Sequence, residues 1–171
     1  LGVTSGSTTK NASIALTFTS TEPITNFSVG SISVTNGSLN SSFARISDTV
    51  YTATFTPNAN NETGKTVCSI SVAAGTFADA VGNYNSIPSN TFNWTFDNTA
   101  PSLTIESTTV GVASGSMTKN ASIALTFTST EPTTNFSVGS ISVTNGSLNS
   151  SFARISDTVY TATFTPNANN G

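Results

Sequence analysis

The chain has 171 residues, of which 8% are charged, 60 are serine or threonine and 19 are asparagine, and its net charge is −3. This balance provides no basic field for nucleic acid, and no apolar run reaches the ~20 residues of a membrane helix, so neither nucleic-acid binding nor membrane insertion is predicted for this segment. Histidine is absent and cysteine occurs once, which removes the commonest general base, any internal disulfide and a cysteine-rich zinc site.

Apolar residues alternate with serine and threonine early in the chain. Ile14, Leu16 and Phe18 predict one half-buried strand. Residues 27–29 and 32–34 predict two short strands, with a bulge or a crossing between sheets at Gly30-Ser31, where the alternation changes parity. The pair Asn36-Gly37 then predicts a hairpin turn, because both residues tolerate positive φ.

The same alternation continues along the chain. Strands are predicted over residues 51–55, 68–72 and 92–96, and a short strand over 103–105 after a break at Pro101. Cys68 is in phase with Ile70 and Val72, so its side chain is expected in the core. About seven strands in ~100 residues, each with one apolar face, predict an all-β fold of tandem immunoglobulin-like β-sandwiches of Greek-key type.

An internal repeat organises these elements. Residues 1–62 return as residues 110–171 at an offset of 109, and 57 of the 62 positions are identical. Copies this similar have not specialised for different tasks. A pattern of this kind is ordinary for a fibre or stalk and unusual for an enzyme.

The domain boundary is predicted at residues 97–101, where Pro101 stiffens a short connector. Residues 1–97 then form one repeat without its first strand. Residues 98–171 form a second repeat without the strands that match 66–72 and 91–96. Such a repeat would leave an apolar face and strand edges uncovered. Either another chain or sequence beyond Gly171 would complete this repeat, and we favour the second alternative.

Four segments carry a resemblance to a known family: residues 21–37, 50–57, 72–83 and 97–101. In this order they resemble the bacterial Ig-like repeats of large cell-surface adhesins and biofilm proteins. The resemblance implies tandem extracellular β-sandwiches that extend a protein away from a cell, and it implies no catalytic residues. The scarcity of acidic residues departs from the calcium-bound linkers of such repeats.

No catalytic residues are predicted. Ser7 and Lys10 match the first part of the acylating motif of penicillin-binding enzymes, but the partner motifs of that chemistry are missing from the sequence. No cofactor is expected. The best calcium candidates are Asp97, Asp79 and Glu22, grouped at one end of the repeat, although their ordinary roles would be turns and solubility.

Asparagine precedes a serine or threonine two positions later at ten places, slightly more than the composition produces by chance. In a eukaryotic, viral or archaeal source some of these sites would carry glycans. The ten candidates are Asn11, Asn26, Asn36, Asn40, Asn61, Asn93, Asn120, Asn135, Asn145 and Asn149.

The sequence thus predicts a structural extracellular module that forms a stalk, spacer or fibre of a cell-surface adhesin-like protein. Its expected partners are neighbouring repeats, identical chains in a fibre, or a cell-surface or glycan ligand. The alternative is a glycan-, ice- or partner-binding module that uses loop ends or threonine rows. These rows are Thr17 and Thr19; Thr52, Thr54 and Thr56; and Thr95.

Overall fold

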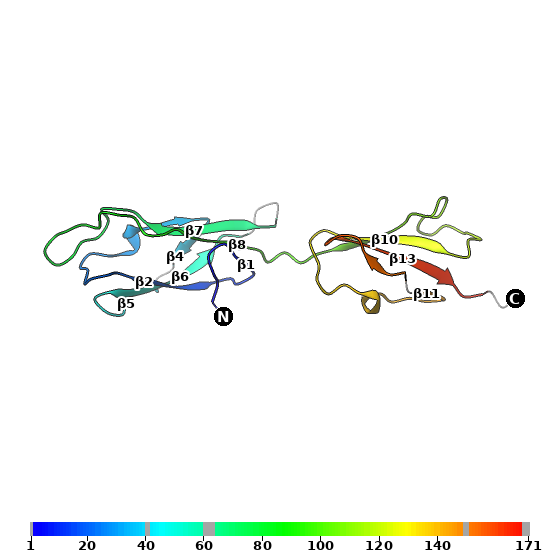
Figure 1. Cartoon of the computed structure of the whole chain (residues 1–171), viewed down its shortest axis with the longest axis horizontal. Helices are drawn as coiled ribbons and strands as arrows, with labels where there is room; N and C mark the ends of the chain where they lie inside the picture. Colours follow the sequence, from blue (N-terminus) through cyan, green and yellow to red (C-terminus); the bar gives the residue numbers. More distant parts are fainter. Residues whose placement is uncertain (1, 40–41, 60–63, 149–150, 169–171) are drawn as a thin grey trace. The chain divides into compact units, whose positions relative to one another are not determined.

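The computed structural model describes residues 2–39, 42–59, 64–148 and 151–168 (Figure 1). The chain divides into two compact units, Leu1–Thr99 and Ala100–Gly171. We call them unit 1 and unit 2.

Unit 1 is a sandwich of two β-sheets, as predicted. One sheet has the order β1 (Thr8–Thr9), β8 (Phe92–Phe96), β7 (Thr66–Val72) and β3 (Ile32–Thr35). The other has the order β2 (Ile14–Thr19), β6 (Val50–Pro57) and β4 (Gly37–Leu39), with β5 (Ala44–Arg45) also paired to β6. All described pairs in unit 1 are antiparallel except β1 with β8, which is parallel.

The core of unit 1 lies between the two sheets and is built by the alternating residues. Trp94 of β8 meets Phe55 of β6 edge to face, with ring centroids 4.6 Å apart, and both side chains are fully buried. Phe27 contacts four further aromatic rings at centroid distances of 5.1–5.6 Å. Edge-to-face aromatic contacts of this kind stabilise a core beyond the area they bury.

Two local predictions are wrong. Residues 27–28 form no strand, and Val29–Ser31 is a 3-10 helix in which the N–H of Ser31 donates to the carbonyl of Ser28 (3.0 Å). Asn36-Gly37 is not a hairpin turn, because β3 and β4 on either side of it belong to different sheets. Asn36 adopts a φ of 56° and the chain crosses between the layers there. Asparagine is among the few residues that adopt this conformation readily.

The described residues of unit 2 form one sheet, with the order β11 (Gly146–Leu148), β13 (Val159–Pro166), β10 (Ile123–Ser129) and β9 (Leu103–Ser107). β12 (Ala153–Arg154) also pairs with β13, and Val138–Ser140 is a 3-10 helix. Its buried residues include Phe127, Tyr160 and Ala162. How unit 2 is completed stays a prediction.

The two units show that identical segments adopt different structures when the strands beside them differ. Residues 32–35 form β3, which pairs with β7. The identical residues 141–144 form no strand, and the described part of unit 2 contains no counterpart of β7. Similarly, Phe55 is fully buried beside Trp94, whereas its counterpart Phe164 is only half-buried. Extended structure here therefore depends on long-range pairing rather than on local propensity.

Candidate functional site

β1 and β8, the first and last described strands of unit 1, run side by side in the same direction. A force that pulls these two strands in opposite directions along their length would load the bonds between them in shear. Three backbone hydrogen bonds link the two strands. They join Gly6 N–H to Asn93 O (2.7 Å), Thr95 N–H to Ser7 O (2.9 Å) and Asp97 N–H to Thr9 O (2.9 Å).

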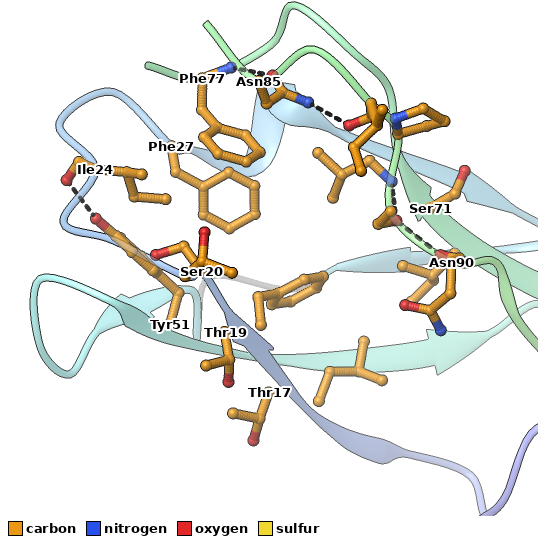
Figure 2. A pocket seen from close by; sticks show the side chains of 18 of the residues that line it. Thr17, Thr19, Ser20, Ile24, Phe27, Tyr51, Ser71, Phe77, Asn85 and Asn90 are labelled. Carbon is orange, nitrogen blue, oxygen red and sulfur yellow. Dashed lines mark hydrogen bonds between the residues drawn. The ribbon is translucent and has the colours of Figure 1, made fainter. Parts of the chain in front are cut away.

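A groove of about 790 Å³ opens along the edge of unit 1, between β2 and the opposite sheet (Figure 2). Leu16 and Phe18 of β2 line one wall and are only half-buried. Figure 2 shows Phe27 and Phe77 lining the interior, while Thr17 and Thr19 of β2 point away from it. The opposite wall comes from β7 and the segment before β8; its residues include Ile70, Val72, Asn85, Ile87, Pro88, Ser89 and Asn90.

Side-chain hydrogen bonds hold the loop of this second wall. Asn85 Oδ1 accepts from the N–H of Thr76 (2.8 Å), and its amide nitrogen donates to the carbonyls of Ala73 (2.8 Å) and Ile87 (3.1 Å). Ser89 Oγ accepts from the N–H of Val72 (2.9 Å). These contacts within unit 1 hold the loop of the second wall in place.

Asp79 organises the turn at one end of this loop. Its carboxylate accepts hydrogen bonds from the N–H groups of Val81 (2.9 Å) and Asn83 (2.9 Å) and from the Asn83 side-chain amide (2.8 Å). These bonds, those from Asn83 first, lower the pKa of the Asp79 carboxyl below its usual value. Asp79 thus has a turn-forming role in the described structure.

The three calcium candidates are not brought together. Asp79 and Glu22 both line the groove. Asp97 instead follows β8, at the end of the sheet where Phe96 pairs with Thr66. The loop that holds Asp79 connects the opposite ends of β7 and β8, so the length of these strands separates Asp97 from Asp79. Asp97 forms an ion pair with Lys65 (3.3 Å). Among the described residues, no group of three or more histidine, cysteine or acidic side chains could hold a metal ion.

Most of the asparagines predicted as glycan acceptors are exposed. Asn11, Asn26, Asn36, Asn93, Asn135 and Asn145 are exposed and Asn120 is half-buried. Two of them have structural contacts: Asn26 Oδ1 accepts from the N–H of Ala78 (2.7 Å), and the Asn36 amide donates to the carbonyl of Val67 (2.8 Å). Asn40, Asn61 and Asn149 lie outside the described residues. Glycosylation stays a prediction.

The threonine rows do not form one regular array. Thr17 lies opposite Thr52 across β2 and β6, but Thr19 lies opposite Val50 and Thr54 lies opposite Ala15. The other two threonines are placed elsewhere: Thr56 pairs with Ser38, and Thr95 belongs to the other sheet. A flat, repeating ligand face therefore gains little support from these positions.

Cys68 lies in the core, as predicted. Its side chain is fully buried, and burial raises the pKa of its thiol. A buried thiol of this kind behaves as a small apolar group rather than as a reactive one.

Two tandem stretches of the chain match one family model. The model of the bacterial Ig-like domain matches residues 1–96 and again residues 97–171. The chain belongs to the bacterial Ig-like domain family. Such Ig-like domains are non-catalytic modules and are typically extracellular or surface-exposed. No curated protein and no solved structure matches the chain.

The predicted recognition of tandem bacterial Ig-like repeats is therefore confirmed, and the Ig-like module is a generic structural one. Within the described ranges, no helix is long and apolar enough to span a membrane. Sequence reasoning missed both the parallel terminal ladder and the groove. The two-residue strand β1 carries no alternation signal, and the groove exists only after distant segments have paired.

Proposed function

We propose that this Ig-like chain is a load-bearing spacer in the stalk of a cell-surface adhesin-like protein, located outside the cell. The observation that carries this proposal is the parallel ladder between β1 and β8, the first and last described strands of unit 1. Bonds loaded in shear must break together, whereas bonds loaded as in a hairpin break one at a time. A domain closed in this way suits transmission of tension along a chain.

Three further features support the same role. The two copies are nearly identical, so repetition adds length to the chain rather than chemical diversity. The surface is rich in neutral hydroxyl and amide groups, so its hydration depends little on salt or pH. The family is typically extracellular or surface-exposed. The alternative, a glycan- or ice-binding threonine face, has only the Thr17–Thr52 pair in its favour.

Single-molecule stretching of the full chain tests the spacer role. We expect unit 1 to unfold in one event that releases about 300 Å of contour, from the span between β1 and β8 at ~3.3–3.6 Å per residue. Thr95→Pro removes the central bond of the ladder, because the N–H of Thr95 donates to Ser7 and not to β7. This variant should unfold at lower force and lose about 1–3 kcal/mol of stability.

The matched control is Thr17→Pro, which introduces a proline into the edge strand β2 instead. The N–H of Ser20 donates to Thr49 of the β6 side, so by the two-residue alternation of an antiparallel strand the N–H of Thr17 points to the open edge. Its unfolding force should stay near that of the parent chain. Equal forces for the parent and Thr95→Pro would refute the load-bearing role of the ladder.

A further inference from the structure

The segment that follows β8 stays fastened to unit 1 beyond the end of the strand. The N–H of Asp97 donates to the carbonyl of Thr9 (2.9 Å), which continues the ladder just past β8. Further on, the hydroxyl of Thr99 donates to the carbonyl of Gly64 (3.0 Å), shortly before β7 begins. Unit 1 accordingly extends to Thr99.

The carboxylate of Asp97 holds the same segment in a second way. Its Oδ1 accepts from the N–H of Thr99 (3.2 Å), and its Oδ2 forms the ion pair with Lys65 (3.3 Å). The Asp97 side chain is only 15% exposed, and a partly buried ion pair is screened by salt less than one in open water. One carboxylate therefore ties the backbone of the segment to the residue that precedes β7.

Gly64 provides the space for the contact with Thr99. It adopts a φ of 78°, in the left-handed region that favours glycine. A Cβ at this position would lie 2.8 Å from the hydroxyl oxygen of Thr99 and 3.3 Å from its Cβ. The first of these distances is shorter than side chains tolerate, so Thr99 occupies room that only a glycine at position 64 leaves open.

The chain on the far side of the boundary is held by unit 2. The N–H of Ser102 donates to the hydroxyl of Thr130 (2.9 Å), and the carbonyl of Ser102 accepts from the N–H of Thr130 (3.0 Å). β9 begins at the next residue and pairs with β10. Between Thr99, held by unit 1, and Ser102, held by unit 2, stand only Ala100 and Pro101.

We propose that residues 97–99 form a strap that is fastened to unit 1 and confines the pivot between the two units to Ala100-Pro101. The sequence predicted a connector over residues 97–101, and the strap withdraws its first part from free rotation. Pro101 fixes its own φ, and the residue before a proline is confined to extended conformations. The fastened connector therefore has few torsions about which it can turn, and release of the strap would free the torsions of residues 97–99 as well.

The strap rests on the proposed spacer role for its use, because a spacer that keeps its direction needs stiff joints. Its tests are made without force, so they can fail while the load-bearing role of the ladder stands. Conversely, equal unfolding forces for the parent chain and Thr95→Pro would refute that role and leave the strap untouched.

Backbone ¹⁵N relaxation of the full chain measures the strap directly. In the parent chain, the order parameters of Asn98 and Thr99 should match those of β8, at about 0.85. Asp97→Ala combined with Thr99→Val removes the side-chain contacts that fasten the strap but keeps the backbone N–H of Asp97 in the ladder. In this double variant both order parameters should fall below about 0.6.

Two further variants make the result specific. Thr17→Val is the matched control, because Thr17 is exposed and belongs to the other sheet of unit 1; it should leave the strap as ordered as in the parent chain. Thr99→Val alone removes only the hydroxyl and should give a smaller loss of order than the double variant. Denaturation followed by the fluorescence of Trp94, which is buried in unit 1, reports that this unit is folded in every variant.

The same relaxation data give a rotational correlation time for each unit and so test the pivot. Both times should shorten in the double variant, because a longer free connector lets the units tumble more independently. They should also shorten in Pro101→Gly, which loosens the pivot itself. Asn98 and Thr99 should nevertheless stay ordered in Pro101→Gly, because their contacts with unit 1 are unchanged.

A strap that is ordered in the parent chain and released in the double variant, with shorter correlation times, would support the proposal. Order parameters below about 0.6 at Asn98 and Thr99 in the parent chain would overturn it. Unchanged order in the double variant, or an equal loss in Thr17→Val, would overturn the fastening contacts. Correlation times that stay constant when the strap is released or Pro101 is replaced would overturn the pivot.

Discussion

At the scale of single residues, the crossing between sheets depends on Gly37. Its Cα lies against the ring of Phe55 and the carbonyl of Thr56, so an added Cβ would overlap both. We expect Gly37→Ala to destabilise unit 1 by about 1–3 kcal/mol, because a well-packed core resists added volume. Chemical denaturation followed by Trp94 fluorescence measures this loss, since Trp94 packs directly on Phe55.

Gly30→Ala is the matched control for this change. A Cβ at Gly30 meets only the Ser28 hydroxyl at 3.6 Å, which is an ordinary contact. This variant should remain close to the parent chain in stability. If both alanine variants unfold at the same denaturant concentration, the close approach of Gly37 to Phe55 is not what shapes the crossing.

A second residue-scale prediction concerns acid and the Asp79 turn. The hydrogen bonds from Asn83 and Val81 lower the pKa of Asp79 in the folded state. A lowered pKa contributes stability above the unfolded-state value of about 3.9, and this contribution is lost as the pH falls through the folded-state value. Asp79→Ala should therefore lower the melting temperature at pH 7, and its deficit should shrink as the solution becomes more acidic.

Asp79→Asn separates hydrogen bonding from charge in this turn. The amide oxygen of asparagine can still accept from the two backbone N–H groups, but it does not titrate. Thermal unfolding of the three chains between pH 7 and pH 2 checks the sign. A deficit for Asp79→Ala that grows on acidification would contradict the proposed role of the carboxylate.

At the scale of elements, two identical segments of the chain differ in whether they form a strand. Residues 32–35 pair with β7, whereas the identical residues 141–144 form no strand. We expect the ladder-bonded amides of β3 to exchange slowly with solvent and the amides of residues 142–144 to exchange rapidly. Residue-resolved hydrogen exchange by NMR makes this comparison within one sample, and equal protection of both segments would show that local sequence decides the structure.

The same scale shows what the sequence could and could not predict. Strands such as β2, β6, β7, β8 and β9 were predictable because their apolar residues alternate over several positions. The short strands β1, β4 and β5 were missed because two or three residues carry no period. The hairpin prediction at Asn36-Gly37 was wrong because a positive φ is compatible both with a hairpin turn and with a crossing between layers. Only the long-range pairing of β3 with β7 and of β4 with β6 distinguishes the two structures.

The candidate sites follow the same logic. Burial of Cys68 was predictable, because its phase along the strand fixes its face. The grouping of Asp97 with Asp79 was not, because their separation depends on how β7 and β8 run between them. The groove and the terminal ladder result from pairings between residues far apart in the sequence, such as Thr8 with Thr95, and no local pattern marks them.

At the scale of the whole molecule, a single principle connects the repeat, the fold and the proposed role. Alternate apolar residues are enclosed between two extended layers in unit 1, and the neutral polar residues between them face water. Packing and backbone pairing are therefore expected to stabilise the unit. Such a unit keeps its length and strength across changing surroundings, which is what a spacer requires.

Unfolding of the full chain with and without calcium tests this central claim most directly. Trp94 fluorescence follows unit 1 alone, because it is the single tryptophan and lies in that core. We predict one cooperative transition with the same midpoint in excess EDTA and in excess calcium. A midpoint that falls by many degrees in EDTA, or a transition that loses its cooperativity there, would contradict a unit stabilised by its packed core.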